Sequence, residues 1–252
     1  MNFVLSALAN LQTNGSTGRF NFLQKNREYE TLKIEVDRDD EGWLRCRELA
    51  EKAMQVGDLL TAERMWIAAL RETAFFEETD IRLVMTLDRI SDFYRATRNY
   101  DQCEVYCVKA LMVMEKRTGT RIHRNIANCL NDLAEVYYAK GQYELAEPLC
   151  LEVLSVYQKL SHRNNADIGF AIANLAMLYH ASGKHELAEV YYLWTIRHQI
   201  EVLNASCEAL AILLDNYKNM RARMNQEGTL SGRDLWSRTH HDLQPYSFES
   251  WS

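Results

Sequence analysis

Two cysteines at helical spacing are the first side chains in this sequence that could do chemistry. Cys103 and Cys107 stand four residues apart, which would place both thiols on one face of a helix, as a pair of zinc ligands requires. A structural zinc site needs four ligands, and no histidine or further cysteine stands in register with this pair. Both cysteines also fall on positions of a repeat, described below, that are expected to be buried. We therefore interpret them as core residues.

The seven histidines share no common spacing, so they predict neither a metal site nor an acid–base pair. His180 is the histidine that the repeat register places on a binding surface, where its charge would change near neutral pH. The chain also has no glycine-rich phosphate loop, GxSxG elbow or HExxH helix. The sequence therefore predicts a protein that is not an enzyme and that needs no metal or cofactor.

Composition narrows the class of protein further. Only two prolines and ten glycines occur in 252 residues, which favours an all-helical chain. The net charge of −6 argues against a general nucleic-acid binder. No apolar run approaches the roughly 20 residues that span a bilayer. The six cysteines include no CxxC pair, which is typical of reduced thiols in a cytoplasmic protein. We therefore expect a cytoplasmic protein with no membrane span and no nucleic-acid partner.

A pattern that recurs four times along the chain decides the fold. In each copy a large apolar residue precedes a small one, and a turn residue and a small residue followed by glutamate come later at fixed offsets. The turn positions are 41 residues apart (57 to 98), then 43 (98 to 141) and 42 (141 to 183). The paired large and small residues are Leu49-Ala50, Ile90-Ser91, Leu133-Ala134 and Leu175-Ala176.

The third copy shows how such a unit would fold. Leu130, Leu133 and Tyr137 have the spacing of an apolar helix face. Gly141 would end this helix, because glycine tolerates positive φ just past a helix end, and a second helix would begin near Tyr143. Two antiparallel helices approach closely only where side chains are small. The small residues that would allow this approach are Ala50, Ser91, Ala134 and Ala176 in the first helices, and Ala62, Cys103, Ala146 and Ala188 in the second.

These units resemble the tetratricopeptide repeat, in the longer variety of the kinesin light chains, over about residues 43–220. The segment from Cys129 to Cys150 and the connector from Thr118 to Ala127 are the parts most similar to that family. The resemblance implies an all-α fold, a right-handed α-solenoid of antiparallel helix pairs, in which first helices line a concave groove. It also implies a protein that binds other proteins.

Three regions are expected along the chain. Residues 1–40 would hold an N-terminal segment with a capping helix around Phe20–Val36, and residues 41–222 the repeat domain. A fifth first helix, Glu208–Tyr217, has no second helix after it, as the terminal cap of a repeat array requires. Residues 223–252 would form a flexible tail that carries aromatic residues.

Both ends of the chain could dock elsewhere. Residues 1–11 contain a short apolar stretch with no basic residue before it, which favours a short docking helix over a signal peptide. In the tail, large aromatics in polar surroundings would make good binding anchors: Trp236, Tyr246, Phe248 and Trp251. The tail could pack on the last helix, dock on a partner or occupy the chain's own groove.

The repeat register predicts which residues face the concave groove. They lie two and one positions before, and two and five positions after, the large apolar residue of each first helix. In the second to fourth copies these are Asp88, Arg89, Asp92 and Arg95; Asn131, Asp132, Glu135 and Tyr138; and Ala173, Asn174, Met177 and His180. The first copy adds Arg47, Glu48, Glu51 and Met54, and the cap adds Asp215 and Lys218.

One groove position is mostly acidic, with Glu51, Asp92, Glu135 and Asp215 interrupted by Met177. A row of carboxylates favours a basic or neutral peptide and speeds its arrival. Neighbouring arginines partly neutralise these acids, so the alternative is that the charges are only solvated.

Asn131 and Asn174 stand where related repeats use asparagine to hydrogen-bond a peptide backbone. The resulting hypothesis is an adaptor or scaffold that binds a peptide segment of a protein partner. Two alternatives remain. One is a ligand-gated regulator that responds to a peptide signal, with a joint in the weak first repeat or at Asn164-Asn165. The other is an architectural protein that self-associates.

Overall fold

A computed structural model describes residues 40–160, 166–203, 214–222 and 224, with the side chains of 198–203 excepted. Several expectations fall outside these residues: the helix around Phe20–Val36, the connector at Asn164-Asn165, and the aromatic tail. Cys207, His162 and the histidines at 240 and 241 lie outside them as well. The described residues fall into two compact units, which meet along the chain between Gly141 and Gln142.

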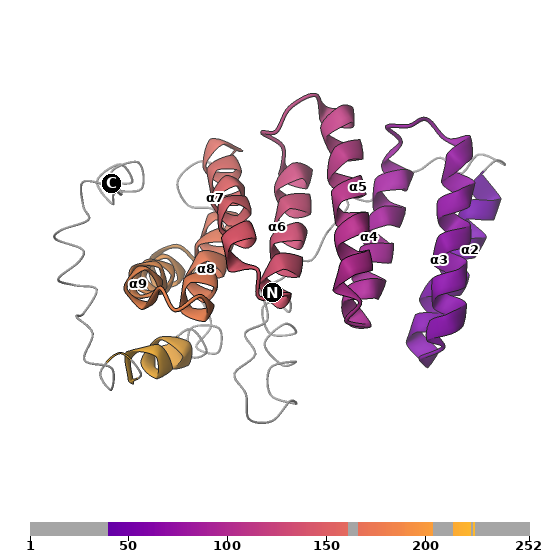
Figure 1. Ribbon diagram of the computed structural model, residues 1–252. Coiled ribbons are helices and arrows are strands. Elements are labelled where there is room, and N and C mark those ends of the chain that lie inside the picture. The colour runs from indigo at the N-terminus through magenta and orange to yellow at the C-terminus, as the bar shows by residue number, and fades with distance from the viewer. Residues whose placement is uncertain (1–39, 161–165, 204–213, 223, 225–252) are drawn as a thin grey trace. The chain divides into compact units, whose positions relative to one another are not determined.

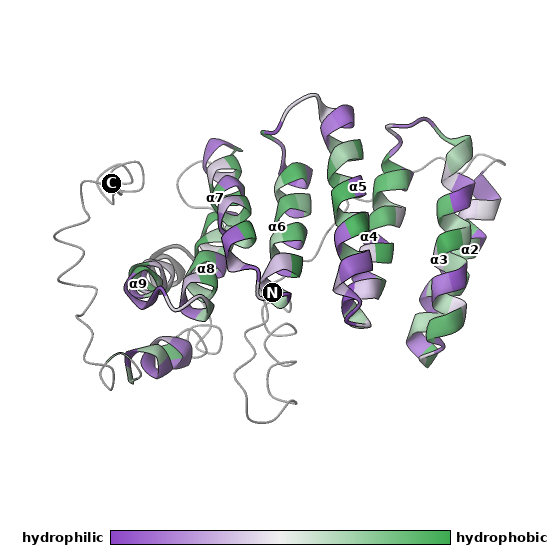
Figure 2. Cartoon of the chain, viewed as in Figure 1, coloured by the Kyte–Doolittle hydropathy of each residue, from purple (hydrophilic) through white to green (hydrophobic). Residues whose placement is uncertain are grey.

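The described part of the first unit consists of two helix pairs followed by one further first helix (Figure 1). In it α2 packs on α3, α3 on α4, α4 on α5 and α5 on α6. Their bounds are Glu41–Val56 (α2), Leu59–Glu72 (α3), Ile81–Ala96 (α4), Tyr100–Thr118 (α5) and Arg124–Ala139 (α6), with a short 3-10 helix, η2, at Thr73–Phe75. Hydrophobic and hydrophilic residues both occur along each of α2 to α6 in Figure 2, as in amphipathic helices.

The second unit continues the same pattern. It contains α7 (Tyr143–Leu160), α8 (Ala166–Ala181) and α9 (His185–Leu203), and residues 214–222 are also helical. In it α7 packs on α8, and α8 packs on α9. All regular structure in the described ranges is helical, so the predicted all-α solenoid of helix pairs is confirmed. No helix in the same ranges combines the length and the apolar character that crossing a membrane requires.

The turn between the two helices of a pair has the same backbone conformation in each repeat. Gly57, Gly141 and Gly183 have φ values of 77°, 73° and 75°, in the left-handed region that glycine adopts at little cost. In the second repeat Arg98 occupies this position, with φ of 60°. The second repeat therefore keeps the shape of the turn with a residue that is strained in it.

The small residues of the pattern are buried in all four repeats. Ala50, Ala134, Ala176, Ala62, Ala146 and Ala188 are all 0% exposed, and Ser91 and Cys103 are 2% and 1% exposed. In the second repeat the Sγ atom of Cys103 lies 3.2 Å from the carbonyl oxygen of Ser91 and donates to it. Cys103 and Cys107 (3% exposed) are thus core residues, as predicted.

The large apolar residue of the pattern is buried in all repeats but the first. Ile90, Leu133 and Leu175 are 1%, 6% and 0% exposed, whereas Leu49 is 42% exposed. In the described part of the chain, α2 has no second helix before it to cover Leu49. The first repeat therefore keeps the large apolar residue of the pattern at a position that is exposed.

A tyrosine–glutamate hydrogen bond links each second helix to the first helix that follows it. The Tyr hydroxyl donates to the Glu that follows the small residue of the second helix. These bonds are Tyr94 to Glu63 at 2.7 Å, Tyr137 to Glu104 at 3.0 Å, Tyr179 to Glu147 at 3.0 Å and Tyr217 to Glu189 at 2.9 Å. The bond recurs in both units, so it is a feature of the repeat.

Three of these glutamates also accept from a cation on the following first helix or turn. The ammonium nitrogens of Lys140 and Lys184 lie 2.7 Å and 2.6 Å from the carboxylates of Glu104 and Glu147. Arg221 lies 3.0 Å from Glu189, whose side chain is only 1% exposed. A buried carboxylate is stable only when paired, so Tyr217 and Arg221 together fix residues 214–222 on α9.

Arg98→Gly is expected to stabilise the protein by about 0.5–1 kcal/mol, because glycine removes the cost of a side chain at positive φ. Urea unfolding of the two proteins measures the difference. Gly141→Ala is the matched opposite change: no atom lies within 4 Å of an added Cβ there, so only the backbone strain is added. An Arg98→Gly variant that is less stable than the parent would contradict the strain.

Tyr137→Phe is expected to lower the free energy of unfolding by about 1–2 kcal/mol at pH 7, because Glu104 loses a donor. Burial, followed by the hydrogen bond to Glu104, raises the pKa of Tyr137. The folded protein therefore holds the phenol proton more tightly than the unfolded chain does. This contribution is complete below about pH 10 and declines as the pH rises further.

The measurement is urea unfolding between pH 7 and pH 11, with Tyr100→Phe as the control. Tyr100 lies in the same unit, and none of the hydrogen bonds found among the described residues involves its hydroxyl. The gap between the parent and Tyr137→Phe should narrow above about pH 10. If the difference in the free energy of unfolding stays constant from pH 7 to pH 11, the protonated hydroxyl of Tyr137 does not stabilise the fold.

Candidate functional site

The first helices of the first unit share one continuous surface, which we call the first-helix wall. It consists of Arg47 and Glu51 on α2, Arg89, Asp92 and Arg95 on α4, and Glu135 on α6. Arg95 joins α4 to α6, because its Nη1 atom lies 2.9 Å from Glu135 Oε2. These six residues are among those that the repeat register predicts to face the groove.

Charges alternate along the first-helix wall. Arg47 lies 3.7 Å from Glu51, and Arg89 lies 3.8 Å from Asp92. Asp92 also contacts Arg95, which bonds Glu135 in turn. Every acidic member of the wall therefore has an arginine within ion-pair distance. This pairing argues for a wall of mixed charge rather than for a row of unopposed carboxylates.

A small pocket opens on the wall between α2 and α4. It is lined by Trp43, Arg47, Glu51, Trp66, Met85, Thr86 and Arg89. Its volume of about 110 Å³ is several times the roughly 10–15 Å³ that a single water needs. The two tryptophans are 1% and 3% exposed, so they form its inner lining, while Glu51 and Arg89 remain accessible on the wall.

Hydrogen bonds fix the inner lining of this pocket. The indole N–H of Trp43 donates to Thr86 Oγ1 at 2.8 Å, and that hydroxyl donates to the Arg82 carbonyl at 2.7 Å. The guanidinium of Arg47 lies 5.2 Å from the centroid of the Trp43 ring. Trp43 and Thr86 thus join α2 to α4, and Arg47 is held beside the indole by a cation–π contact.

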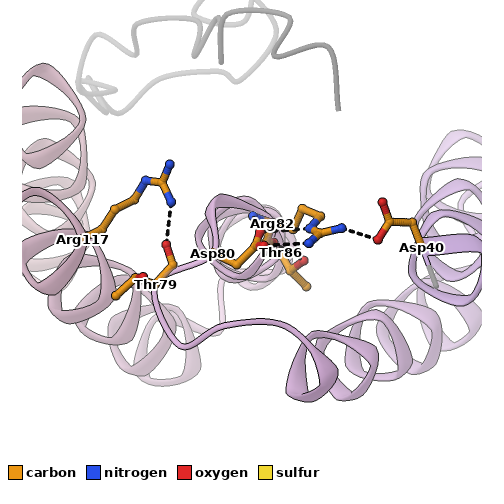
Figure 3. Close-up of polar contacts among 6 residues, drawn as sticks. All are labelled: Asp40, Thr79, Asp80, Arg82, Thr86 and Arg117. Atoms are coloured by element: carbon orange, nitrogen blue, oxygen red, sulfur yellow. Dashed lines mark hydrogen bonds and ion pairs between the residues drawn. The ribbon is translucent and has the colours of Figure 1, made fainter. Parts of the chain in front are cut away.

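An arginine at the beginning of α4 ties the pocket to the connector before it (Figure 3). Arg82 donates from Nε and Nη2 to Asp80, at 2.9 Å and 2.7 Å, and it also contacts Asp40. Its guanidinium lies 3.7 Å from the centroid of the Phe76 ring, and Phe76 meets Trp43 edge to face at 6.4 Å. Planar, two-pronged pairs of this kind hold both partners in one orientation.

Eight other predicted groove residues lie in more enclosed places, whereas Glu48, Asp215 and Lys218 are exposed and Met54 is half-buried. Tyr138 is half-buried, and seven others are buried: Asp88 (3% exposed), Asn131 and Asp132 (7% each), Ala173 (1%), Asn174 (1%), Met177 (3%) and His180 (4%). The Nδ1 atom of His180 lies 3.2 Å from the Tyr192 hydroxyl. The structure therefore brings together the charged residues of α2, α4 and α6, and it encloses the asparagines.

Four of the residues that line the pocket were not predicted from the sequence: Trp43, Trp66, Met85 and Thr86. Trp43 stands near the start of the first copy, where the later copies have no tryptophan. This tryptophan was the only feature of the sequence that could have indicated the pocket. The contact between Trp43 and Thr86 itself could not be predicted, because the two residues are 43 positions apart.

Side chains that could bind a metal ion do not form a cluster among the described residues. Among the described residues, no three or more His, Cys, Asp or Glu side chains gather closely enough to hold a metal ion. His123, for example, serves as the N-cap of α6, where its Nδ1 accepts from the Asn125 amide at 3.1 Å.

Comparison with known proteins identifies the repeat. The tetratricopeptide repeat model matches residues 82–159 and 125–201. BtubC (BKLC) from P. vanneervenii has a similar structure, with a TM-score of 0.54 and 16% identity over 75% of this chain and 93% of that one. No curated protein sequence matches the chain.

A second similar protein, from Podosopora anserina, is described as a putative kinesin light chain with nearly identical TPR-like repeats. Its TM-score is 0.57, with 16% identity over 75% of this chain and 99% of that one. A single-residue variant of that protein gives 0.60, with 16% identity over 81% and 99%. At this identity the likeness concerns the fold.

The chain is therefore a helical repeat protein of the solenoid class. More narrowly, residues 82–201 match the tetratricopeptide repeat model, and the fold is similar to that of kinesin-light-chain-like repeats. Such repeats generally mediate protein–protein interactions and scaffolding.

Asp80→Asn is expected to lower the free energy of unfolding by about 1–3 kcal/mol at pH 7, because Arg82 loses one of its two charged acceptors. The hydrogen bond from Arg82 holds the pKa of Asp80 below its usual value. This stabilisation is complete above about pH 4 and is lost as the pH falls through the lower folded-state pKa.

Urea unfolding from pH 7 down to pH 3 measures this difference between Asp80→Asn and the parent. Glu48→Gln is the control, since it removes an exposed carboxylate of α2 in the same unit. If the gap between Asp80→Asn and the parent does not shrink in acid, the ion pair with Arg82 is not its source.

Proposed function

We propose that the first-helix wall binds a peptide segment of a protein partner, so that the chain acts as an adaptor or scaffold. The pocket between α2 and α4 is the observation that carries this proposal. It offers an apolar lining at the inner end and charged groups at the mouth, on the surface that connects successive first helices. A partner side chain that enters it would leave water and meet a lining that is part apolar and part polar, with Trp43 and Trp66 at its inner end.

The size of the pocket supports a peptide rather than a cofactor as its occupant. Sites for small molecules typically enclose roughly 300–1,000 Å³. A volume of about 110 Å³ is smaller than that and suits part of one side chain. The rest of the bound segment would then lie along the wall, over Asp92, Arg95 and Glu135.

The charges of the wall support a partner segment of mixed charge. Arg47 and Arg89 flank the pocket together with Glu51, so both signs meet the occupant at the mouth. Surface ion pairs of this kind contribute little stability, about 0–1 kcal/mol each, so a partner can exchange them for its own at small cost. The expected ligand therefore carries an apolar anchor with acidic and basic residues beside it.

The test is a selection of displayed linear 15-residue peptides on the full chain, followed by affinity measurements on the enriched peptides. Arg89→Glu, at the mouth of the pocket, should weaken their binding at least tenfold, because it reverses a charge there. Arg64→Glu is the matched control, since Arg64 lies on the second helix α3 and outside the pocket lining.

The two arginine variants together decide the outcome. Equal binding of the enriched peptides to Arg89→Glu and to the parent would exclude the pocket as the anchor site. Equal loss in both variants would point to a non-specific effect of net charge and would also contradict the proposal. Circular dichroism of both variants shows that each remains helical.

A further inference from the structure

Two side chains at the pocket of the first-helix wall have hydrogen-bonding capacity that the described part of the chain does not use. Arg47 and Glu51 both line this pocket. The Nε atom of Arg47 is buried and has no hydrogen-bond partner there. Glu51 Oε1 lies 3.7 Å from it, which is an ion-pair distance but is too long for a hydrogen bond. Buried polar groups are nearly always bonded, so this nitrogen is a donor that an occupant of the pocket could use.

Glu51 lacks the donor that serves the acidic residues at the same position of the next two repeats. Asp92 and Glu135 both accept hydrogen bonds from Arg95, at 2.9 Å for Glu135. The first repeat has Met54 at the position of Arg95, five residues after the large apolar residue. No hydrogen bond to Glu51, whose side chain is 43% exposed, occurs within the described ranges. Glu51 is therefore the carboxylate of the first-helix wall that an occupant can engage without breaking a hydrogen bond.

The donor and the acceptor are held in place beside the apolar lining. The guanidinium of Arg47 lies against the Trp43 indole, so little side-chain entropy is lost when it binds a ligand. Glu51 follows Arg47 by four residues on α2, which places both side chains on one face of the helix. The pocket thus presents a donor and an acceptor 3.7 Å apart. A group that satisfies both must itself accept and donate.

The primary amide of an asparagine or a glutamine fits this pair best among protein side chains. Its oxygen would accept from Arg47, and its NH2 group would donate to Glu51. The oxygen and nitrogen of an amide are about 2.2 Å apart, so two bonds of about 2.9 Å reach both partners in nearly parallel directions. A hydroxyl would make both bonds from one oxygen at an angle of about 80°, which is far below the tetrahedral value.

Charged side chains suit this pair less well. A carboxylate bonded to Arg47 would lie beside the carboxylate of Glu51, and like charges repel. Arg89, the other cation of the pocket, already pairs with Asp92 at 3.8 Å. An ammonium group bonded to Glu51 would bring no acceptor for Arg47 and would lie beside its positive charge. A neutral amide leaves the attraction between Arg47 and Glu51 in place.

We propose that the segment bound by the first-helix wall carries an asparagine or glutamine within two positions of its apolar anchor, and that Arg47 and Glu51 select this residue by bridging its amide. The inference rests on the proposed function, because it concerns the occupant of the same pocket. The apolar anchor supplies the burial, and the nearby amide supplies the recognition. A site that hydrogen-bonds a polar group discriminates strongly against analogues that lack it, because its own groups are then left unpaired.

The test is a selection, on the full chain, of displayed 15-residue peptides in which the central position is Leu, Ile, Met or Phe and all others are random. On the parent, Asn or Gln should be enriched at least threefold at one position within two of the centre. On Glu51→Gln the preference there should shift to Asp or Glu, because the new amide can donate to a carboxylate. Glu41→Gln is the matched control: it also removes a carboxylate from α2, but outside the pocket lining, and should keep the amide preference.

Affinities of one enriched peptide then measure the bridge. Replacing its amide residue by the acid of the same length, or by methionine, should weaken binding to the parent at least tenfold. The acid-bearing peptide should regain affinity on Glu51→Gln but not on Glu41→Gln. A loss of packing alone would not exchange the preferred peptide in this way.

The outcomes separate this inference from the proposed function. Enrichment of acidic or basic residues near the anchor on the parent, or the same preference on the parent and on Glu51→Gln, would overturn the amide bridge. If the enriched peptides lose affinity for Arg89→Glu yet show no amide preference, the pocket binds an anchor and only this inference is wrong. If no peptide depends on Arg89, the proposed function is wrong and this inference falls with it.

Discussion

The tyrosine–glutamate hydrogen bond between consecutive repeats is the interaction on which the rest of the structure depends. A solenoid has no contacts between distant parts of the chain, so its stability is a sum over neighbouring units. Each such bond to a carboxylate contributes about 1.5–3 kcal/mol, and it fixes how far one helix pair is shifted against the next. Because the same bond recurs from Glu63 to Tyr217, the first helices remain in register within each unit. Two of the three helices that form the first-helix wall, α4 and α6, are held in this way.

Three residues of the first two repeats depart from the repeat pattern, in their exposure, in their backbone conformation or in their contacts. Leu49 keeps the identity of a core residue although it is 42% exposed, because the described chain provides no preceding second helix. Arg98 keeps the left-handed turn without glycine. Trp43 joins the first repeat to the second through Thr86, and the pocket lies beside this contact. These three departures from the repeat pattern all lie in the first two repeats.

The periodic parts of the structure could be predicted from the sequence and the others could not. Gly141 and Tyr143 mark a helix end and a helix start correctly, because capping and turn preferences are local. The register also indicated which charged residues lie on the wall, since helical periodicity determines the face of a helix on which each side chain lies. The register could not show that Asn174 and His180 are buried, because the direction in which a side chain points does not tell which other residues cover it. The pocket escaped prediction for a related reason: Trp43 and Thr86 are distant in the sequence and occur in only one copy.

The paired charges of the wall limit how a partner could be recognised. Glu51, Asp92 and Glu135 each have an arginine within 4 Å, so their fields largely cancel beyond one Debye length, about 8 Å at physiological salt. Long-range attraction would therefore add little to the rate at which a partner binds the wall. The net charge of a partner would contribute little to its selection. The same pairing holds the arginines in place, so less side-chain entropy would be lost on binding. Selectivity would then rest on the pocket, through the fit of one apolar side chain and the distance from it to neighbouring charges.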